Sequence, residues 1–320
     1  MIDFILTLFK SISCENTVLC VPSISGILLS LVSGIDTEPK KELNKFIKNI
    51  VSYTVSNEIT LENKIYLPDN INICNNFEKE IQTYGTDIVK INFTNSNLIG
   101  DKINNWLPSM NFKHGLINKI LSHSNIIALS LISFKGEFLY TFDVVSDKFI
   151  TNERTIKIIN MMYRRDYFKI KKQENVIIVE IPLKDFYNLV IIMPSDFNFN
   201  KIEAELTNKN ILSWCDDMEM EEIKLLFPMF AFGRSYNLNS ILIKMGITKL
   251  FTCFNLPNIS NNVTYPTIVH KCFIDLSYDN IANNYYYDDK NIPLIKINKP
   301  FIFFIRENEN IFYIGRVTNL

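Results

Sequence analysis

The residues that could bind a metal ion or attack a substrate are few in this chain, and they are scattered along it. Its three histidines, His114, His123 and His270, and its six cysteines form no C-x-x-C or H-E-x-x-H spacing of the kind that zinc sites use. Its nine glycines are dispersed, so neither a G-x-G-x-x-G turn nor a P-loop for phosphate can be written. No nucleophile and base form a recognisable pair. The sequence therefore predicts a protein with no metal, no cofactor and no enzymatic activity.

Charge and hydropathy exclude two further classes of partner. The 33 basic and 34 acidic residues leave a net charge of −1, so no strong global field attracts nucleic acid or an anionic membrane. No apolar run approaches the roughly 18 residues of a membrane-spanning helix. With 47% hydrophobic residues among 320, the chain can bury a large core, which excludes global disorder. We expect a globular protein that binds neither nucleic acid nor membrane.

Cysteine usage and the first residues predict the compartment. The segment Met1–Lys10 lacks the basic start and small-residue cleavage site of a signal peptide. The cysteines have no framework-like spacing, which is typical of free thiols in a reducing cytosol. Three N-x-S/T sequons begin at Asn92, Asn258 and Asn262, but an asparagine-rich chain contains such sequons by chance. The sequence predicts an unglycosylated cytoplasmic protein.

The predicted secondary structure that must position any site is mainly helical in the first third of the chain and mainly strands after it. An apolar run at 24–31 follows Pro22 and predicts a helix capped by Ser23, and a second helix begins near Thr37 with Pro39 in its first turn. Further helices are predicted at 76–84, 102–110, 199–206 and 238–245. Strands dominate elsewhere, and they are expected at 59–66, 87–93, 126–133, 149–158, 166–171, 176–182, 188–193, 220–230, 268–276, 301–305 and 311–317. This mixture predicts an α+β fold.

Seven stretches, in the correct order over most of the chain, resemble the conserved motifs of the serpin family. The most specific are the last two, which match the family's H/K-P-F-x-F-x-I and I-L-F-x-G-R-V signatures nearly position by position. The stretches are Ser133–Phe138, Met161–Tyr163, Phe227–Phe230, Met245–Phe251, Val269–Asp275, Lys299–Arg306 and Ile311–Val317. One match would be weak, whereas seven in order are specific.

The resemblance implies a fold and a setting. A serpin is a single domain, here 1–320, with three β-sheets, eight or so helices and an exposed reactive loop, here at about 276–298. The stretch 50–59 is too short for one helix that most serpins carry, which suggests that this helix is deleted. The trimmed length and the start without a leader resemble the small intracellular serpins of poxviruses. The resemblance therefore implies a monomer in the cytoplasm of a host cell, directed at host proteases.

Several interior positions matter in the family because they lie where the central sheet opens. His270 is expected to hydrogen-bond with Ser23 and Ser130 beneath the parting strands. Here Ser130 replaces the usual Asn and Cys20 the usual Ser, so this polar cluster is thinner than in typical members. Phe138 replaces the usual Trp at the point where the loop first enters the sheet. These changes suit packing, because an apolar residue of similar size is tolerated, but they put controlled opening in doubt.

Serpins act by a conformational trap, in which a protease cleaves the reactive loop and the loop then inserts as a new strand in the central sheet. Counting back from Lys299–Phe301, in the register of related loops, predicts the scissile bond at Asp289–Lys290. Aspartate there suits caspase-like or granzyme-like proteases. A different spacing puts the bond at Tyr286 or Tyr287, which suits chymotrypsin-like enzymes, and the composition leaves both readings open.

The loop departs from the pattern of an efficient inhibitor. It is about five residues shorter than in typical members, which removes on the order of 17 Å of reach at roughly 3.3 Å per residue. The hinge, where the family has small residues, consists here of Asn280, Ile281, Ala282, Asn283 and Asn284. We therefore expect a serpin-type inhibitor with weak inhibition, cleaved mostly as a substrate. The alternative is a serpin-fold protein that binds a partner without inhibiting it.

Overall fold

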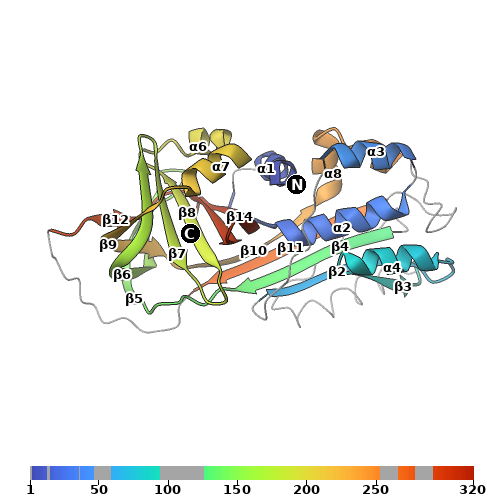
Figure 1. Cartoon of the computed structure of the whole chain (residues 1–320), viewed down its shortest axis with the longest axis horizontal. Helices are drawn as coiled ribbons and strands as arrows, with labels where there is room; N and C mark the ends of the chain where they lie inside the picture. Colours follow the sequence, from blue (N-terminus) through green and yellow to red (C-terminus); the bar gives the residue numbers. More distant parts are fainter. Residues whose placement is uncertain are drawn as a thin grey trace.

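The computed structural model describes residues 2–12, 15–35, 37–46, 59–93, 126–252, 266–277 and 291–320. Two sheets form the frame of the described chain and meet near its middle, with helices on one side (Figure 1). Eight helices occur in these ranges, in agreement with the expected number. They are α1 (Ile2–Ser11), α2 (Val21–Gly34), α3 (Thr37–Phe46), α4 (Asn75–Thr83), α6 (Phe199–Glu205), α7 (Asn208–Cys215), α8 (Leu238–Lys244) and α9 (Lys249–Thr252). None of them is long and apolar enough to cross a membrane.

The five-stranded sheet contains Ser130 and His270, the residues expected where the central sheet opens. Its strands are, in spatial order, β10 (Phe230–Asn237), β11 (Pro266–Leu276), β4 (Ile126–Lys135), β2 (Ile59–Pro68) and β3 (Thr86–Ile91). The central pair, β4 and β11, is parallel and continuous from Ile126 opposite Pro266 to Lys135 opposite Asp275. Both strands are buried almost throughout, as expected for a parallel pair covered on both faces.

Helix α2 lies along the five-stranded sheet (Figure 1). It begins at Val21 rather than at Ile24, so the prediction that Ser23 caps this helix is wrong. Cys20 is the N-cap residue and makes no side-chain cap, while Pro22 occupies the first turn. The helix can approach β2 and the end of α4 because Gly26 has no side chain; a Cβ there would lie 2.7 Å from Nδ2 of Asn63 and 2.7 Å from the Tyr84 carbonyl oxygen. Because Ser23 lies inside the helix and does not cap it, its side chain can face the sheet.

The second sheet has nine strands. They are β1 (Thr17–Cys20), β14 (Asn310–Val317), β13 (Phe301–Glu307), β8 (Asn188–Pro194), β7 (Val176–Pro182), β6 (Ile156–Gln173), β9 (Glu219–Pro228) and β12 (Leu294–Lys296), with β5 (Asp143–Ile150) also paired to β6. Strand β6 is 18 residues long and pairs first with β5, then with β9 and finally with β7. Because one strand spans all three pairings, two of the three expected sheets are joined into one.

Several elements differ from the sequence-based prediction, which did not include β1, β10 or α7. The strand predicted at 149–158 is instead a hairpin, in which β5 and β6 are joined by a turn closed by a hydrogen bond from Thr151 N to Thr155 O. The predicted loop at about 276–298 includes strand β12, which pairs with β9. The helix predicted at 102–110 and the deletion near 50–59 lie outside the described residues.

The core divides into two apolar clusters. One lies between the helices and both sheets, and the other lies between the two sheets and is rich in phenylalanine. The fully buried Arg316 of β14 donates to the Ile12 carbonyl, pairs with Glu203 of α6 and lies 4.8 Å over the Phe9 ring. This arginine ties the N-terminal helix to the last strand.

Candidate functional site at the centre of the five-stranded sheet

A row of polar residues crosses the five-stranded sheet from edge to edge. Ladder pairing sets its members directly opposite one another, strand by strand, in the order Thr86, Asn63, Ser130, His270 and Tyr236. Each is buried, and most residues two positions away on the same face, such as Ala128, Ile132 and Ile268, are buried and apolar. Buried polar groups are costly unless they are hydrogen-bonded. The row therefore depends on its partners beneath the sheet.

Those partners are supplied by α2 and β1. Ser30 of α2 donates to Thr86 Oγ1 at 2.8 Å. The Ser23 hydroxyl reaches two strands at once, with Asn63 Oδ1 at 3.1 Å and Ser130 Oγ at 2.5 Å. At the other end, the Val18 amide of β1 donates to the Tyr236 hydroxyl at 3.1 Å. Hydrogen bonds to α2 and β1 thus hold both ends of the row.

The direction of each hydrogen bond in the centre follows from one backbone donor. The Cys20 N–H donates to Nε2 of His270 at 3.3 Å, so this ring nitrogen is the acceptor and the proton resides on Nδ1. Nδ1 then donates to Ser130 Oγ at 2.9 Å. Ser130 in turn donates to Ser23, and Ser23 to the side-chain oxygen of Asn63. The neutral imidazole is therefore held in a single tautomer.

Burial keeps this centre uncharged. His270 is completely buried, and desolvation lowers the pKa of its imidazole to about 3. Burial also raises the pKa of the Cys20 thiol and that of the Tyr236 hydroxyl well above their ordinary values. Uncharged, inaccessible groups suit a structural junction rather than acid–base chemistry.

The structure confirms contact between His270 and Ser130 and corrects the expectation for Ser23, which reaches the histidine only through Ser130. It also adds Asn63, which the sequence reasoning missed. Ser130 lacks the amide that the family usually carries at that position. Asn63, directly opposite on the neighbouring strand, has an amide whose oxygen accepts from Ser23, while its buried Nδ2 makes no hydrogen bond within the described residues. A signal was available, because Asn63 interrupts the apolar alternation of Ile59, Leu61 and Ile65.

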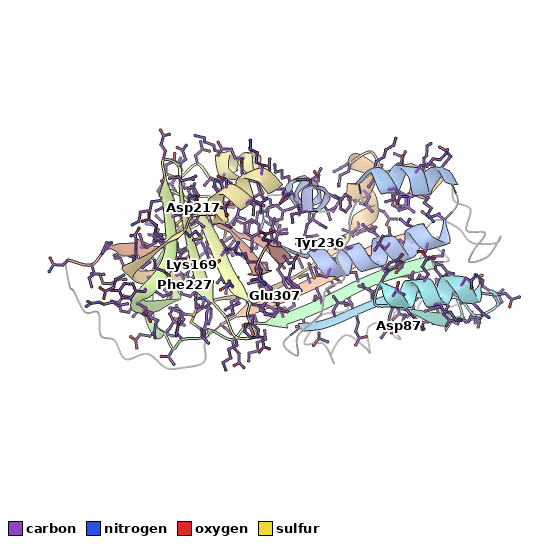
Figure 2. The ribbon with its side chains drawn as sticks, viewed as in Figure 1. Asp87, Lys169, Asp217, Phe227, Tyr236 and Glu307 are labelled. Carbon is purple, nitrogen blue, oxygen red and sulfur yellow. The ribbon has the colours of Figure 1, made fainter. Side chains whose placement is uncertain are left out.

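Phe138 lies away from the row, three residues beyond the end of β4. It is buried, pairs through an isolated bridge with Leu183, and its ring centroid lies 5.2 Å from that of Phe142 and 5.7 Å from that of Phe227. Figure 2 shows Phe227 and Tyr236 well separated along the molecule. The aromatic cluster and the polar row are therefore distinct features of the central region.

The predicted reactive bond and hinge lie outside the described residues. This holds for Asp289 and Lys290, for the alternatives Tyr286 and Tyr287, and for the hinge Asn280–Asn284. The structure does describe both ends of the segment that carries them. Strand β11 ends at Leu276, and β12 begins at Leu294 in a different sheet.

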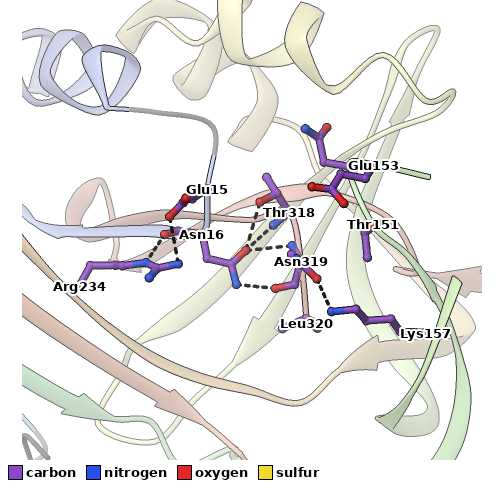
Figure 3. A pocket seen from close by; sticks show the side chains of 10 residues that line it. Glu15, Asn16, Thr151, Glu153, Lys157, Arg234, Thr318, Asn319 and Leu320 are labelled. Carbon is purple, nitrogen blue, oxygen red and sulfur yellow. Dashed lines mark hydrogen bonds and ion pairs between the residues drawn. The ribbon is translucent and has the colours of Figure 1, made fainter. Parts of the chain in front are cut away.

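A polar hollow of about 390 Å³ lies elsewhere, where the β5–β6 turn meets the last residues (Figure 3). The Asn16 side chain accepts from the backbone amides of Thr318 and Asn319, and Lys157 donates to the Asn319 side chain. Most polar contacts drawn there thus connect protein segments to one another. Within the described ranges, no group of three or more histidine, cysteine or acidic side chains is arranged to hold a metal ion.

Solved structures with this architecture cover nearly the whole chain. Native protease nexin-1 with heparin matches 99% of this chain and 97% of its own, with a TM-score of 0.87 and 19% identity. Uncleaved ovalbumin matches 99% and 98%, with a TM-score of 0.87 and 20% identity. At these identities the likeness establishes the fold alone.

The family model described as "Serpin (serine protease inhibitor)" matches residues 2–320, and the chain belongs to the serpin family. Among its relatives, serine proteinase inhibitor 1 of Variola virus is 26% identical, over 94% of this chain and 91% of the relative. Serine proteinase inhibitor 2 of Myxoma virus (strain Uriarra) is 24% identical, over 93% of each. The family is described as one of serine protease inhibitors and not of enzymes, which agrees with the sequence-based prediction that the chain is not an enzyme.

Proposed function

We propose that this serpin offers the segment between β11 and β12 to a protease, and that after cleavage the segment inserts between β4 and β11 slowly and incompletely. The observation that carries the proposal is the parallel β4–β11 pair at the centre of the sheet. A strand that enters between two parallel neighbours has the same orientation relative to each, so it can run antiparallel to both and bond to both. The chain that leaves β11 has this direction when it turns back.

Insertion requires only one side-chain bond of the polar row to break. A new strand moves β4 and β11 apart by about 4.8 Å, which separates His270 from Ser130. The bonds of Ser130 with Ser23 and of Ser23 with Asn63 lie on the β4 side of the gap. Those of His270 and Tyr236 with β1 lie on the other side. The row is thus divided into two parts that each remain bonded.

After insertion, the residue directly opposite His270 would be a tyrosine in each of three possible registers. With a two-residue turn after Leu276, antiparallel pairing sets Tyr285 opposite His270 and Asp289 opposite Pro266. A three-residue turn sets Tyr286 opposite His270, and a four-residue turn sets Tyr287 there. Directly opposed side chains share a face, so the ring would point toward α2, where His270 and Ser130 have no exposed surface.

Slow insertion changes the outcome of the encounter with a protease. Ile281, Asn283, Tyr285 and Tyr287 would face α2 in one parity, and Ala282, Asn284 and Tyr286 in the other. Either parity buries an asparagine amide at about 1–3 kcal/mol unless it is paired, in addition to the bulky rings. The acyl-enzyme then has time to hydrolyse. We infer that the protein is cleaved mainly as a substrate.

The test is a cleavage panel of caspases, granzyme B and chymotrypsin-like proteases. We expect cleavage at Asp289–Lys290, or at Tyr286 or Tyr287, little SDS-stable adduct, and little rise in Tm afterwards. Fragment masses identify the bond, gels detect the adduct, and calorimetry measures Tm. A near-stoichiometric adduct, or a Tm rise of tens of degrees, contradicts slow insertion.

The runner-up is a non-inhibitory serpin that binds a partner. The same tyrosines favour it, because a segment that inserts poorly is not a trap. The panel separates the two, since the runner-up predicts no preferred cleavage between 278 and 293. We further propose that residues 1–320 fold as one monomeric domain in the cytoplasm. The described cysteines, Cys20, Cys74, Cys215 and Cys272, are free thiols, which suits that compartment.

A further inference from the structure

The turn between β7 and β8 carries a strained, exposed aromatic residue. Asp185 and Phe186 have φ of 54° and 65°, in the left-handed region, and Tyr187 N closes the turn on Lys184 O at 3.2 Å. Two consecutive positive φ values define a turn that favours Asn-Gly, and a bulky residue is unfavourable there. Phe186 is nevertheless 87% exposed, so its ring adds little to the core. Local stability does not account for a phenylalanine at this position.

This turn lies beside the point where the chain leaves β11. Gly136 N donates to Asp275 O at 2.9 Å, near the end of that strand. The next residue, Glu137, accepts from Lys184 N at 2.8 Å, within the turn. Two consecutive residues thus connect the end of β11 with the base of the turn. A globular molecule engaging the segment that follows β11 has this turn within reach.

A second exposed apolar residue, Leu139, lies on the chain segment that follows Glu137. Leu139 N donates to Pro182 O at 3.1 Å, so the chain after Glu137 runs alongside the end of β7. The Leu139 side chain is 52% exposed. The backbone hydrogen bonds of Leu139 with Pro182 and of Lys184 with Glu137 hold these two segments side by side. Aromatic residues supply most of the binding energy at interaction surfaces. Backbone strain is typically retained where it serves a function.

We propose that Phe186 is a docking contact for the protease that cleaves the segment between β11 and β12, an inference that rests on the proposed function. The partner surface that fits is an apolar recess bordered by a basic side chain or free N–H groups. The ring of Phe186 enters the recess, and the exposed carboxylate of Asp185 meets the donor. Lys184 is already paired with Glu137, so the rim needs no acidic group.

The experiment compares cleavage rates in the full-length protein, using the panel protease that cuts this segment fastest. Phe186→Gly is expected to lower kcat/KM for cleavage about tenfold, while Tm does not fall, because glycine accepts the positive φ. Phe186→Trp should retain the rate, since it keeps a large ring. Leu212→Gln, at another exposed apolar position on α7, is the matched control and should leave the rate unchanged.

The outcomes distinguish a failure of the docking contact from a failure of the proposed function. If Phe186→Gly is cleaved at the wild-type rate, or if Phe186→Trp is as slow as Phe186→Gly, the docking contact is wrong and the proposed function stands. If no protease of the panel cleaves the segment, both proposals are overturned. A loss with glycine that tryptophan rescues, at an unchanged Tm, supports the contact.

Discussion

At the scale of single residues, the polar row depends on Ser130, which joins the two halves of the sheet. Ser130→Ala removes the acceptor of His270 Nδ1–H and the donor to Ser23. An unsatisfied buried donor costs about 1–3 kcal/mol, so we expect the free energy of unfolding to fall by about 2 kcal/mol. Urea denaturation measures this loss. Ser25→Ala is the control, because Ser25 is equally buried but bonds only to the Val21 carbonyl of its own helix. Equal losses in both variants would contradict a special role for Ser130.

His270 also predicts how stability depends on pH. Its folded pKa, about 3, lies below the unfolded value of 6.5, so the unfolded chain binds the extra proton. Stability from this group is fully present above pH 6.5 and declines as pH falls toward 3. The slope is about 1.4 kcal/mol per pH unit, or about 2 kcal/mol between pH 6.5 and 5.

Denaturation midpoints measured across that window test the assignment. The carboxylates whose pKa the structure lowers, such as Glu180, respond at lower pH, since their unfolded values lie near 4. The variant His270→Gln should be less stable at neutral pH and should show a flatter profile from pH 6.5 to 5. An unchanged slope in that variant would assign the effect to another group.

At the scale of elements, the proposed obstacle to insertion is the tyrosine run 285–287. Replacing all three tyrosines with alanine removes the rings that would meet the level of His270 and leaves the described fold untouched. We expect the cleaved variant to gain at least 10 °C in Tm over the cleaved wild-type chain. The reason is that an inserted strand forms backbone hydrogen bonds with the facing edges of both β4 and β11. Calorimetry before and after cleavage measures the gain. The variant Tyr84→Ala, at the half-buried C-cap residue of α4, whose hydroxyl bonds to Glu80 at the surface, serves as the control. No gain in the triple variant would place the obstacle in loop length instead.

At the scale of the whole molecule, Arg316 holds the N-terminal helix, α6 and the last strand together. Its guanidinium is fully buried and bonds to Glu203 and to the carbonyls of Ile12 and Glu15. Arg316→Leu leaves the largely buried carboxylate of Glu203 uncompensated. Breaking such a pair costs about 3–5 kcal/mol, and a loss of that size is expected in urea denaturation. Lys172→Met breaks an exposed pair with Glu221 and should cost less than about 1 kcal/mol. Similar losses in both variants would contradict the role of Arg316.

Ordered motifs and alternating apolar residues are local signals, so they were enough to predict the family, the α+β class and most strands. The sequence also indicated His270 and Ser130 as neighbours through the resemblance. Three features came from the folded chain alone: the amide of Asn63 lies opposite Ser130, Ser23 faces the sheet instead of capping α2, and Gly136 and Glu137 connect β11 to the Phe186 turn. Each of these depends on strand register or helix placement, which bring together residues far apart in the chain. Hydrophobic pattern limits such pairings, and packing of the whole sheet selects one of them.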